Sequence, residues 1–484
     1  MSLFYKTLNG IKWTAIDSAS SAILQFIRVI ILTKILSATD FGIMTMTLVI
    51  TSFSNIFMNF GVSSAIIYKK DNSNEELSSL YWLNVFLGII IYSLLFSFSE
   101  MISYSIFNEK ELSKILKIIS FVFIFSGFSV QFKTLLKKYL KFDVLAKINI
   151  TSFLISFIVT IVLAFKGFGV YSLVYGYVTN SIIHSLFLVP FGLNFNKPKL
   201  FFSWTLSKPY INFGIHQLFT RLIENLGSQL DKLLIGIFLS SEILGFYNVS
   251  KILIEKPVNL IKQIYGKMAF PVLTTIEDTD RLRKWTISSC KIIFLFISPV
   301  FLILLSFPEN VINILYGPKW LPASQFLILL CVLSFFRIFR TSFGPLLLSR
   351  GQVKTQFLYV SINVFLSSCV FGVLIQSSIT DALYGLILLE FFLIQAINYH
   401  LILRPILNLS FLEFIITIFK VSAPIFVSIV ATLVLYNNLP NENLIFIVVS
   451  IFIGQIFLLI PWYFFNYDTF REFMLRLKNK PTIN

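Results

Sequence analysis

The sequence predicts an all-α membrane protein that crosses the bilayer about fourteen times. Of its 484 residues, 56% are hydrophobic and only 13% are charged, and the mean hydropathy is +0.84. A soluble domain carries about 25% charged residues, so this chain has too few charges to cover a water-facing surface. Its apolar residues also gather in continuous runs of the length that a helix needs to span a bilayer. Such runs are too long for the alternating strands of a membrane barrel.

Each apolar run predicts one membrane-spanning helix. The first run contains Asp17 and is followed by no small-residue cleavage site, so it predicts a retained helix and not a signal peptide. Short polar or charged segments separate the runs that follow. The predicted spans are 12–34, 42–67, 80–99, 115–136, 146–165, 169–191, 210–239, 243–272, 285–306, 321–349, 354–375, 382–403, 412–436 and 444–465.

The loops between these spans predict the orientation of the chain. Lys and Arg concentrate in the loops that follow even-numbered spans, and such loops face the cytoplasm in membrane proteins. Both termini are therefore predicted to be cytoplasmic, which requires an even number of spans. The basic loops hold Lys69, Lys70, Lys133, Lys137, Lys138, Lys141, Lys147, Lys197, Lys199, Lys208, Arg281, Arg283, Lys284, Arg350, Lys354 and Arg404.

Several classes of function are excluded by what the sequence lacks. The net charge of +16 is spread over short loops that cannot build a basic face for nucleic acid. No segment has the Gly-rich pattern of a phosphate-binding loop or the spacing of a metal site, so no cofactor or metal is expected. The cysteines are read as small buried hydrophobic residues. The cysteines and histidines, all widely spaced, are Cys290, Cys331, Cys369, His184, His216 and His400.

A short internal repeat follows the first and the seventh spans. Leu36-Ser37 is followed by Gly42, and Leu239-Ser240 is followed by Gly245 at the same offset. Transporters are commonly built from such repeats, with the binding site between them. The chain is therefore predicted to form an N-terminal lobe at 1–208, a C-terminal lobe at 209–405, and two added helices with a basic tail at 406–484.

Polar side chains inside the predicted spans fall on single helical faces. Charged groups within a span are costly and usually face a cavity or a partner. At 100° per residue, the polar residues of the first span lie within an arc of about 80°. The polar faces comprise Thr14, Asp17, Ser21, Gln25 and Arg28 in 12–34; Gln217, Arg221, Glu224, Ser228 and Asp231 in 210–239; and Asn248, Lys251, Glu255, Asn259 and Lys262 in 243–272.

These faces predict a central cavity that favours an anion. Basic groups outnumber acidic groups within the spans, and the guanidinium fork of arginine matches phosphate oxygens. Arg28 and Arg221 are the strongest individual candidates because each lies well inside its span. The predicted cavity residues are Arg28, Arg221, Lys251, Arg337, Arg340, Gln25, Asp17, Glu224, Asp231 and Glu255.

A purely structural role stays open for each of these residues. Arg221 with Glu224, and Lys251 with Glu255, have the spacing of ordinary ion pairs on one helix. Lys262 and Arg340 lie nearer the ends of their spans, where long side chains can extend to the membrane surface.

Several short motifs occur along the chain at characteristic places in the predicted spans and loops. The motifs are Lys6-Thr7-Leu8-Asn9-Gly10-Ile11-Lys12-Trp13, Asp40-Phe41-Gly42, Asn59-Phe60-Gly61, Leu80-Tyr81-Trp82-Leu83-Asn84, Gly245-Phe246-Tyr247-Asn248 and Tyr316-Gly317-Pro318-Lys319-Trp320. In this order and spacing they resemble the polysaccharide-transporter branch of the multidrug/oligosaccharidyl-lipid/polysaccharide flippases. Within that branch the chain is most similar to Wzx-type, colanic-acid-exporter-like proteins, and the similarity covers nearly its whole length.

The resemblance implies a fold, a substrate and a location. It implies two lobes around a cavity and the transfer of undecaprenyl-diphosphate-linked oligosaccharides to the outer leaflet of a bacterial inner membrane by alternating access. Its implied partners are this substrate and the membrane lipids, and association with a polysaccharide polymerase and chain-length machinery stays open. One chain supplies both halves of the cavity, so a monomer suffices.

The same residues disfavour two other functions. A drug or cation extruder of the same superfamily would need carboxylates to dominate the cavity, whereas bases do so here. A membrane-embedded glycan polymerase or ligase would need a large external loop with catalytic groups, whereas the outside loops here are short. The sequence therefore predicts a transporter and not an enzyme.

Overall fold

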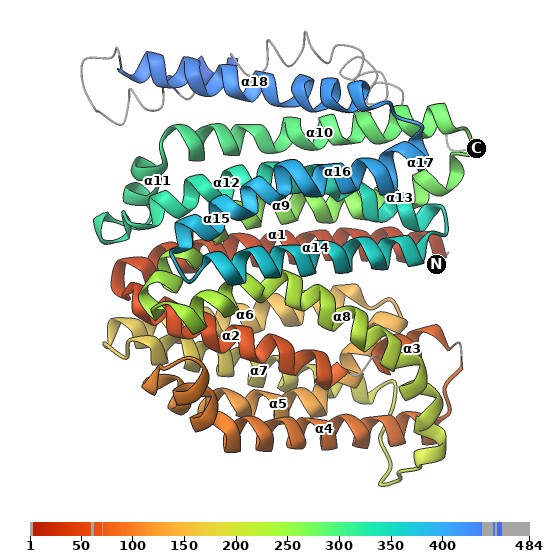
Figure 1. The fold of residues 1–484 in the computed structure, drawn as a ribbon. Coiled ribbons are helices and arrows are strands. Elements are labelled where there is room, and N and C mark those ends of the chain that lie inside the picture. Colours follow the sequence, from red (N-terminus) through yellow and green to blue (C-terminus); the bar gives the residue numbers. More distant parts are fainter. Residues whose placement is uncertain (1–2, 60–61, 70, 438–448, 451–452, 457–484) are drawn as a thin grey trace. The chain divides into compact units, whose positions relative to one another are not determined.

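The described structure contains helices and no strands. The computed structural model describes residues 3–59, 62–69, 71–437, 449–450 and 453–456, and all regular secondary structure in these ranges is helix (Figure 1). The chain divides into two compact units, Met1–Asn248 and Val249–Asn484, called unit 1 and unit 2 below. The predicted all-α class is confirmed. The predicted lobe boundaries at residues 208 and 405 stay a prediction.

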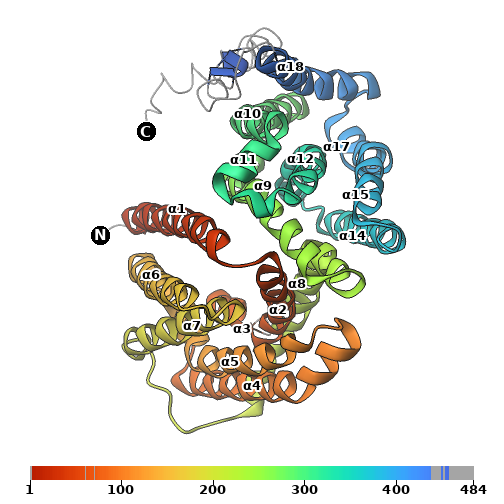
Figure 2. The same ribbon diagram turned by 90° about the vertical axis from the view of Figure 1, so that its left-hand side faces the viewer.

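Unit 1 is a bundle of long helices. Helix α5 packs against α4 and α7, and α6 lies between α7 and α1 (Figure 2). Helix α8 packs against α2, α3 and α4. The helices are α1 (Leu3–Ile35), α2 (Ala38–Asn59), α3 (Val62–Tyr68), α4 (Asn74–Met101), α5 (Lys110–Lys138), α6 (Phe142–Phe165), α7 (Val170–Leu193), α8 (Trp204–Phe238) and the start of α9 (Ser241–Thr275); a π-helical turn, Ile102–Ile106, extends α4.

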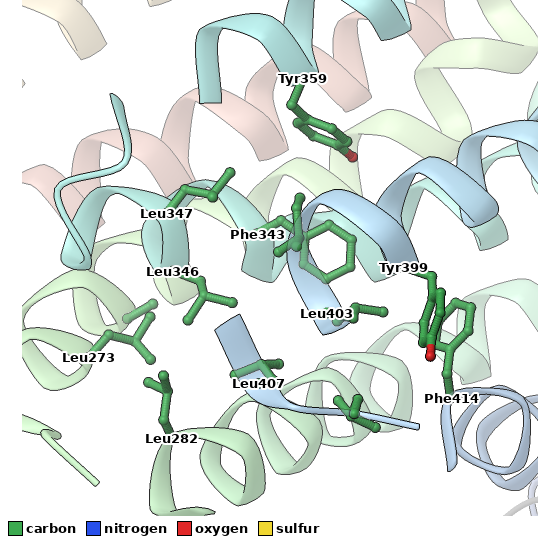
Figure 3. Close-up of a cluster of buried hydrophobic side chains, with 13 residues drawn as sticks. Leu273, Leu282, Phe343, Leu346, Leu347, Tyr359, Tyr399, Leu403, Leu407 and Phe414 are labelled. Atoms are coloured by element: carbon green, nitrogen blue, oxygen red, sulfur yellow. The ribbon is translucent and has the colours of Figure 1, made fainter. Parts of the chain in front are cut away.

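Unit 2 continues α9 and adds a second set of helices around an apolar core. Figure 3 shows part of this core, where Leu273, Phe343 and Leu403 come together from distant parts of the unit. The helices are α10 (Thr279–Ser306), α11 (Pro308–Leu315), α12 (Ala323–Phe339), α13 (Phe343–Ser349), α14 (Val353–Leu374), α15 (Ile379–Leu388), α16 (Gln395–Asn398), α17 (Arg404–Leu407) and α18 (Phe411–Asn437). Two π-helical stretches, Leu389–Ile394 and Tyr399–Leu403, interrupt the series from α15 to α17.

The helices agree closely with the predicted spans. Each of the first thirteen spans coincides with one helix or with a short series of consecutive helices, and 444–465 lies mostly outside the described residues. Eleven helices in the described ranges are long and apolar enough to cross a membrane. Helices α8 and α9, each of 35 residues, are not among them because they carry several charged side chains. The chain is a multi-pass membrane protein, and the count of fourteen spans stays a prediction.

The two copies of the sequence repeat have the same local structure and contact each other within unit 1. Ser37 accepts a hydrogen bond from the backbone N–H of Asp40, and Ser240 accepts one from that of Ile243, at 3.2 and 3.3 Å. Both serines therefore cap the helix that follows them. A Cβ atom on Gly42 would lie 1.6 Å from the carbonyl oxygen of Ser241.

The contact made by the second glycine mirrors that of the first. A Cβ atom on Gly245 would lie 1.9 Å from the carbonyl oxygen of Ala38. Ala38 and Ser241 occupy the same place in the two copies of the repeat, so the contact is reciprocal. Helices α2 and α9 thus meet backbone to backbone at a crossing that only glycine permits.

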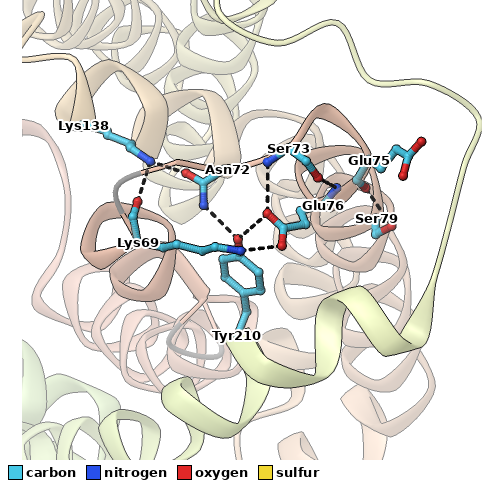
Figure 4. A network of polar contacts seen from close by, with 8 residues as sticks. All are labelled: Lys69, Asn72, Ser73, Glu75, Glu76, Ser79, Lys138 and Tyr210. Atoms are coloured by element: carbon cyan, nitrogen blue, oxygen red, sulfur yellow. Dashed lines mark hydrogen bonds and ion pairs between the residues drawn. The ribbon is translucent and has the colours of Figure 1, made fainter.

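A polar network ties the start of α8 to the α3–α4 connection (Figure 4). The Tyr210 hydroxyl accepts a hydrogen bond from Asn72 at 2.8 Å and donates one to Glu76 at 3.0 Å. Glu76 also accepts from Lys69, and Lys138 donates to Asn72 and to the Lys69 carbonyl. The hydrogen bond to Glu76 raises the pKa of Lys69. Two of the predicted cytoplasmic lysines are therefore part of a structural clamp.

Replacing Tyr210 with phenylalanine is expected to lower the free energy of unfolding by about 1–3 kcal/mol. The change removes two hydrogen bonds and leaves Asn72 and Glu76 without this partner. Thermal or denaturant unfolding of the purified protein would measure the loss. Tyr68→Phe is the matched control because that tyrosine is 77% exposed. Equal stability of the two variants would show that the clamp does not support the fold.

Candidate functional site

A polar cavity of about 510 Å³ lies among α1, α2, α5, α6 and α7 of unit 1. Ligand sites in proteins commonly have volumes of roughly 300–1,000 Å³. Helix α1 contributes Asp17, α5 contributes Lys133 and α6 contributes Asn149, while α7 supplies Asn180 and His184. A hollow lined by such groups inside an apolar bundle is costly in a membrane, so it points to a functional site.

Three of the lining residues form a hydrogen-bonded chain. The amide nitrogen of Asn149 donates to Asp17 Oδ2 at 2.8 Å, and the amide oxygen lies 2.9 Å from His184 Nε2. Because that oxygen only accepts, Nε2 of the imidazole carries the proton. The chain fixes the orientation of all three side chains. Lys133 interacts electrostatically with both Asp17 and His184, so a base and an acid share the cavity.

Arg28 lies next to the cavity and packs on an aromatic ring that lines it. Its guanidinium lies over Phe153, with the central carbon 5.0 Å from the ring centroid, and Phe153 lines the cavity. Both residues lie within predicted membrane spans, so this cation–π contact holds a positive charge beside the polar cavity. Gln25 lies about one helical turn before Arg28 on α1 and is half-buried.

The predicted residues on α8 lie in different surroundings. Arg221 donates to Ser64 on α3 at 3.5 Å, and one turn further along Asn225 donates to Ser52 on α2 at 3.2 Å. Asp231 accepts a hydrogen bond from the hydroxyl of Tyr247. Glu224 is exposed. The contacts of Arg221 and Asn225 join α8 to α3 and α2, and the contact of Asp231 joins it to α9.

The predicted residues of unit 2 form ion pairs. Lys251 is buried and lies 3.6 Å from Glu255, which is the structural alternative that their spacing allowed. Arg337 and Arg340 both approach one oxygen of Glu390, at 3.1 and 2.9 Å. The Glu390 side chain is 0% exposed and belongs to a π-helical stretch, a feature often found at functional sites.

The arginines keep additional contacts around Glu390. Arg340 also donates to Asn363 at 2.7 Å. Lys262 interacts electrostatically with Arg337, Arg340 and Glu390, so positive charge exceeds negative charge around this carboxylate. The role of all ten predicted residues as substrate contacts stays a prediction.

Sequence reasoning missed three residues of these clusters. The charge pattern predicts Lys133 in a cytoplasmic loop, but this residue lies within α5 and lines the cavity. Glu390 is not among the predicted cavity residues, although it falls inside the predicted span 382–403 and a charge within a span is costly enough to mark a functional candidate. His184 looked isolated because Asn149, its link to Asp17, is 35 residues away in sequence.

The sequence matches a known protein family and several known proteins. A family model described as "Polysaccharide biosynthesis protein" matches residues 31–325. The chain is 28% identical to the lipopolysaccharide biosynthesis protein WzxC of Escherichia coli (strain K12), over 90% of this chain and 88% of that protein. It is 27% identical to the teichuronic acid biosynthesis protein TuaB of Bacillus subtilis (strain 168), over 74% of each chain.

A solved structure shares the fold. The lipid II flippase MurJ in an inward closed conformation matches with a TM-score of 0.78 at 14% sequence identity. The match covers 95% of this chain and 99% of that one. The succinoglycan biosynthesis transport protein ExoT of Rhizobium meliloti (strain 1021) is a further relative, 21% identical over 73% of this chain and 71% of that protein.

Proposed function

Because the chain belongs to the polysaccharide biosynthesis protein family, we propose that it moves lipid-linked oligosaccharides across the membrane. The predicted resemblance to a polysaccharide transporter family is confirmed by this membership. The names of the relatives and the shared fold of a lipid II flippase support transport and not catalysis as its activity.

One observation carries the proposal: a large polar cavity with a cation at its border lies inside an apolar helix bundle. A lipid-linked oligosaccharide has a hydrophilic head that cannot cross hydrocarbon unaided, because each unsatisfied polar group there costs several kcal/mol, on the order of 2–7. The hydroxyl, amide and charged groups of the cavity would replace the water that the head loses. Arg28 would stabilise the negative charge of its phosphates.

The finer features follow the same chemistry. We propose that the substrate is an undecaprenyl-diphosphate-linked repeat unit, taken from the inner to the outer leaflet of a bacterial inner membrane. Both termini would face the cytoplasm. The lipid tail would stay in the bilayer while the head group enters the cavity, and alternating access would expose it on the other side. A polymerase and chain-length machinery would act on the product.

The charge of the cavity argues against a cation extruder. Such a transporter would need carboxylates to dominate its site, whereas Asp17 is accompanied by Lys133 and by the neighbouring Arg28. Unit 2 has the same bias, with two arginines at one buried carboxylate.

Deleting the gene in the native host tests the proposal. The deletion strain is expected to lose one surface polysaccharide and to accumulate the matching lipid-linked repeat unit. Re-expression of the chain should restore the polymer and clear the intermediate. A deletion strain that still makes all of its surface glycans would contradict the proposal.

A further inference from the structure

We propose that the polar cavity of unit 1 binds the first sugar of the lipid-linked glycan, the one attached to the phosphates. This inference rests on the proposed function and assigns one part of the substrate to one part of the chain. It also separates two tasks, because the phosphates would bind at Arg28 on the border of the cavity.

The lining of the cavity matches the chemistry of a sugar. Each sugar hydroxyl donates one hydrogen bond and accepts others, so it is best satisfied by a mixture of donors and acceptors. Asn149 and Asn180 offer both kinds of group, Asp17 accepts, and Lys133 donates. Phe153 and Tyr177 add aromatic surface against which the apolar face of a sugar ring can pack.

The charge of the cavity disfavours the phosphates as its occupant. Lys133 shares the space with Asp17, so the two formal charges cancel. A diphosphate placed there would meet the Asp17 carboxylate, and like charges repel each other. A neutral sugar, or one with a single acidic group beside Lys133, meets no such penalty.

The position of Arg28 indicates which sugar of the substrate lies at the cavity. Its guanidinium packs on Phe153, and the same ring lines the cavity. In the proposed substrate the diphosphate is bonded directly to the first sugar. A phosphate at Arg28 therefore places that sugar beside Phe153, at the cavity, and not a sugar further along the glycan.

The hydrogen-bonded chain pre-orients the site. Asn149 is held between Asp17 and His184, at 2.8 and 2.9 Å, so these side chains need little reordering when a sugar binds. A rigid set of polar groups discriminates strongly, because a ligand without the matching hydroxyl leaves them unpaired.

Binding of two probes to the purified full-length protein tests this assignment. One probe is the lipid-linked glycan extracted from the deletion strain, and the other is undecaprenyl diphosphate without sugar. Wild-type protein is expected to bind the first at least about tenfold more tightly. Asn180→Ala and His184→Leu should remove most of this preference and leave binding of undecaprenyl diphosphate unchanged. Arg28→Ala should weaken binding of both probes.

Two matched controls lie outside the cavity. Asn194 is exposed near the end of α7, and His400 is exposed in unit 2. Asn194→Ala and His400→Leu should keep the wild-type preference. Asn180 takes no part in the chain from Asp17 to His184, so its variant tests the cavity without disturbing that chain.

The outcomes separate the two proposals. If wild-type protein binds both probes equally, or if the cavity variants keep the preference, the sugar assignment is wrong and the flippase proposal stands. If wild-type protein binds neither probe, the proposed function itself fails. If the cavity variants keep the preference but change the pH dependence of transport, the cavity conducts protons and does not bind the sugar.

Discussion

Arg28→Ala and Arg221→Ala are each expected to reduce surface polysaccharide at least tenfold without reducing the amount of folded protein in the membrane. Removing one partner of a desolvated charged contact costs about 2–5 kcal/mol. About 1.4 kcal/mol is a tenfold change in affinity. Arg28 lies at the border of the cavity, and Arg221 lies on the polar face of α8 beside Ser64. Polysaccharide staining and membrane protein levels measure the two effects.

Two further variants sharpen this result. Arg28→Lys keeps the charge but loses the planar fork, so it should restore only part of the activity. Arg404→Ala is the matched control because this arginine is exposed. Normal polysaccharide in both alanine variants would overturn the assignment of Arg28 and Arg221 to the substrate site.

Gly42→Leu is expected to abolish transport, and it should lower the melting temperature far more than a surface substitution. The first side-chain atom alone would lie 1.6 Å from the Ser241 carbonyl oxygen, so α2 and α9 would have to separate. Inserting side-chain atoms into a packed contact costs about 1–3 kcal/mol and sometimes more. Gly245→Leu should have a similar effect because its contact with Ala38 is reciprocal.

Helix α9 also contains the control position for this prediction. Gly266 also lies on α9, but a Cβ atom there would meet nothing within 4 Å. Gly266→Leu should therefore leave both the melting temperature and transport close to wild type. If Gly42→Leu behaved like Gly266→Leu, the close crossing of α2 and α9 would not be needed for folding or transport.

The helices could be predicted from sequence because a bilayer imposes their length and composition. The interruptions could not. Helix α11 begins at Pro308, in what was predicted to be a loop. Its start depends on the non-helical backbone of Phe307, for which hydropathy carries no signal. The π-helical stretches after α15 likewise depend on tertiary packing.

The candidate site could also be predicted only in part from the sequence. Helical periodicity predicted that Asp17 and Arg28 share the polar face of α1, and both lie at the cavity or on its border. Periodicity could not show that Asn149 and His184 complete a chain to Asp17, because they come from two other helices. It also could not show that Arg337 and Arg340 share one carboxylate, since Glu390 is about fifty residues away.

The repeat was the most informative short motif. The sequence similarity of its two copies is weak evidence for a repeat, since a match of a few residues arises by chance. In the structure the equivalent serines cap equivalent helices, and the equivalent glycines pack on equivalent carbonyls. A sequence can indicate such symmetry, but the contact between the copies follows only from the fold.

Translocation by purified protein in liposomes tests the central claim most directly. The lipid-linked glycan from the deletion strain is incorporated into both leaflets, and a glycosidase that cannot cross the membrane is added outside. The measurement is repeated with imposed proton and sodium gradients. Liposomes with wild-type protein should lose the protected inner-leaflet glycan, whereas those with the Arg28→Ala variant should keep it. If the inner-leaflet glycan stayed fully protected from the glycosidase in liposomes with wild-type protein, under every gradient, the account would be contradicted.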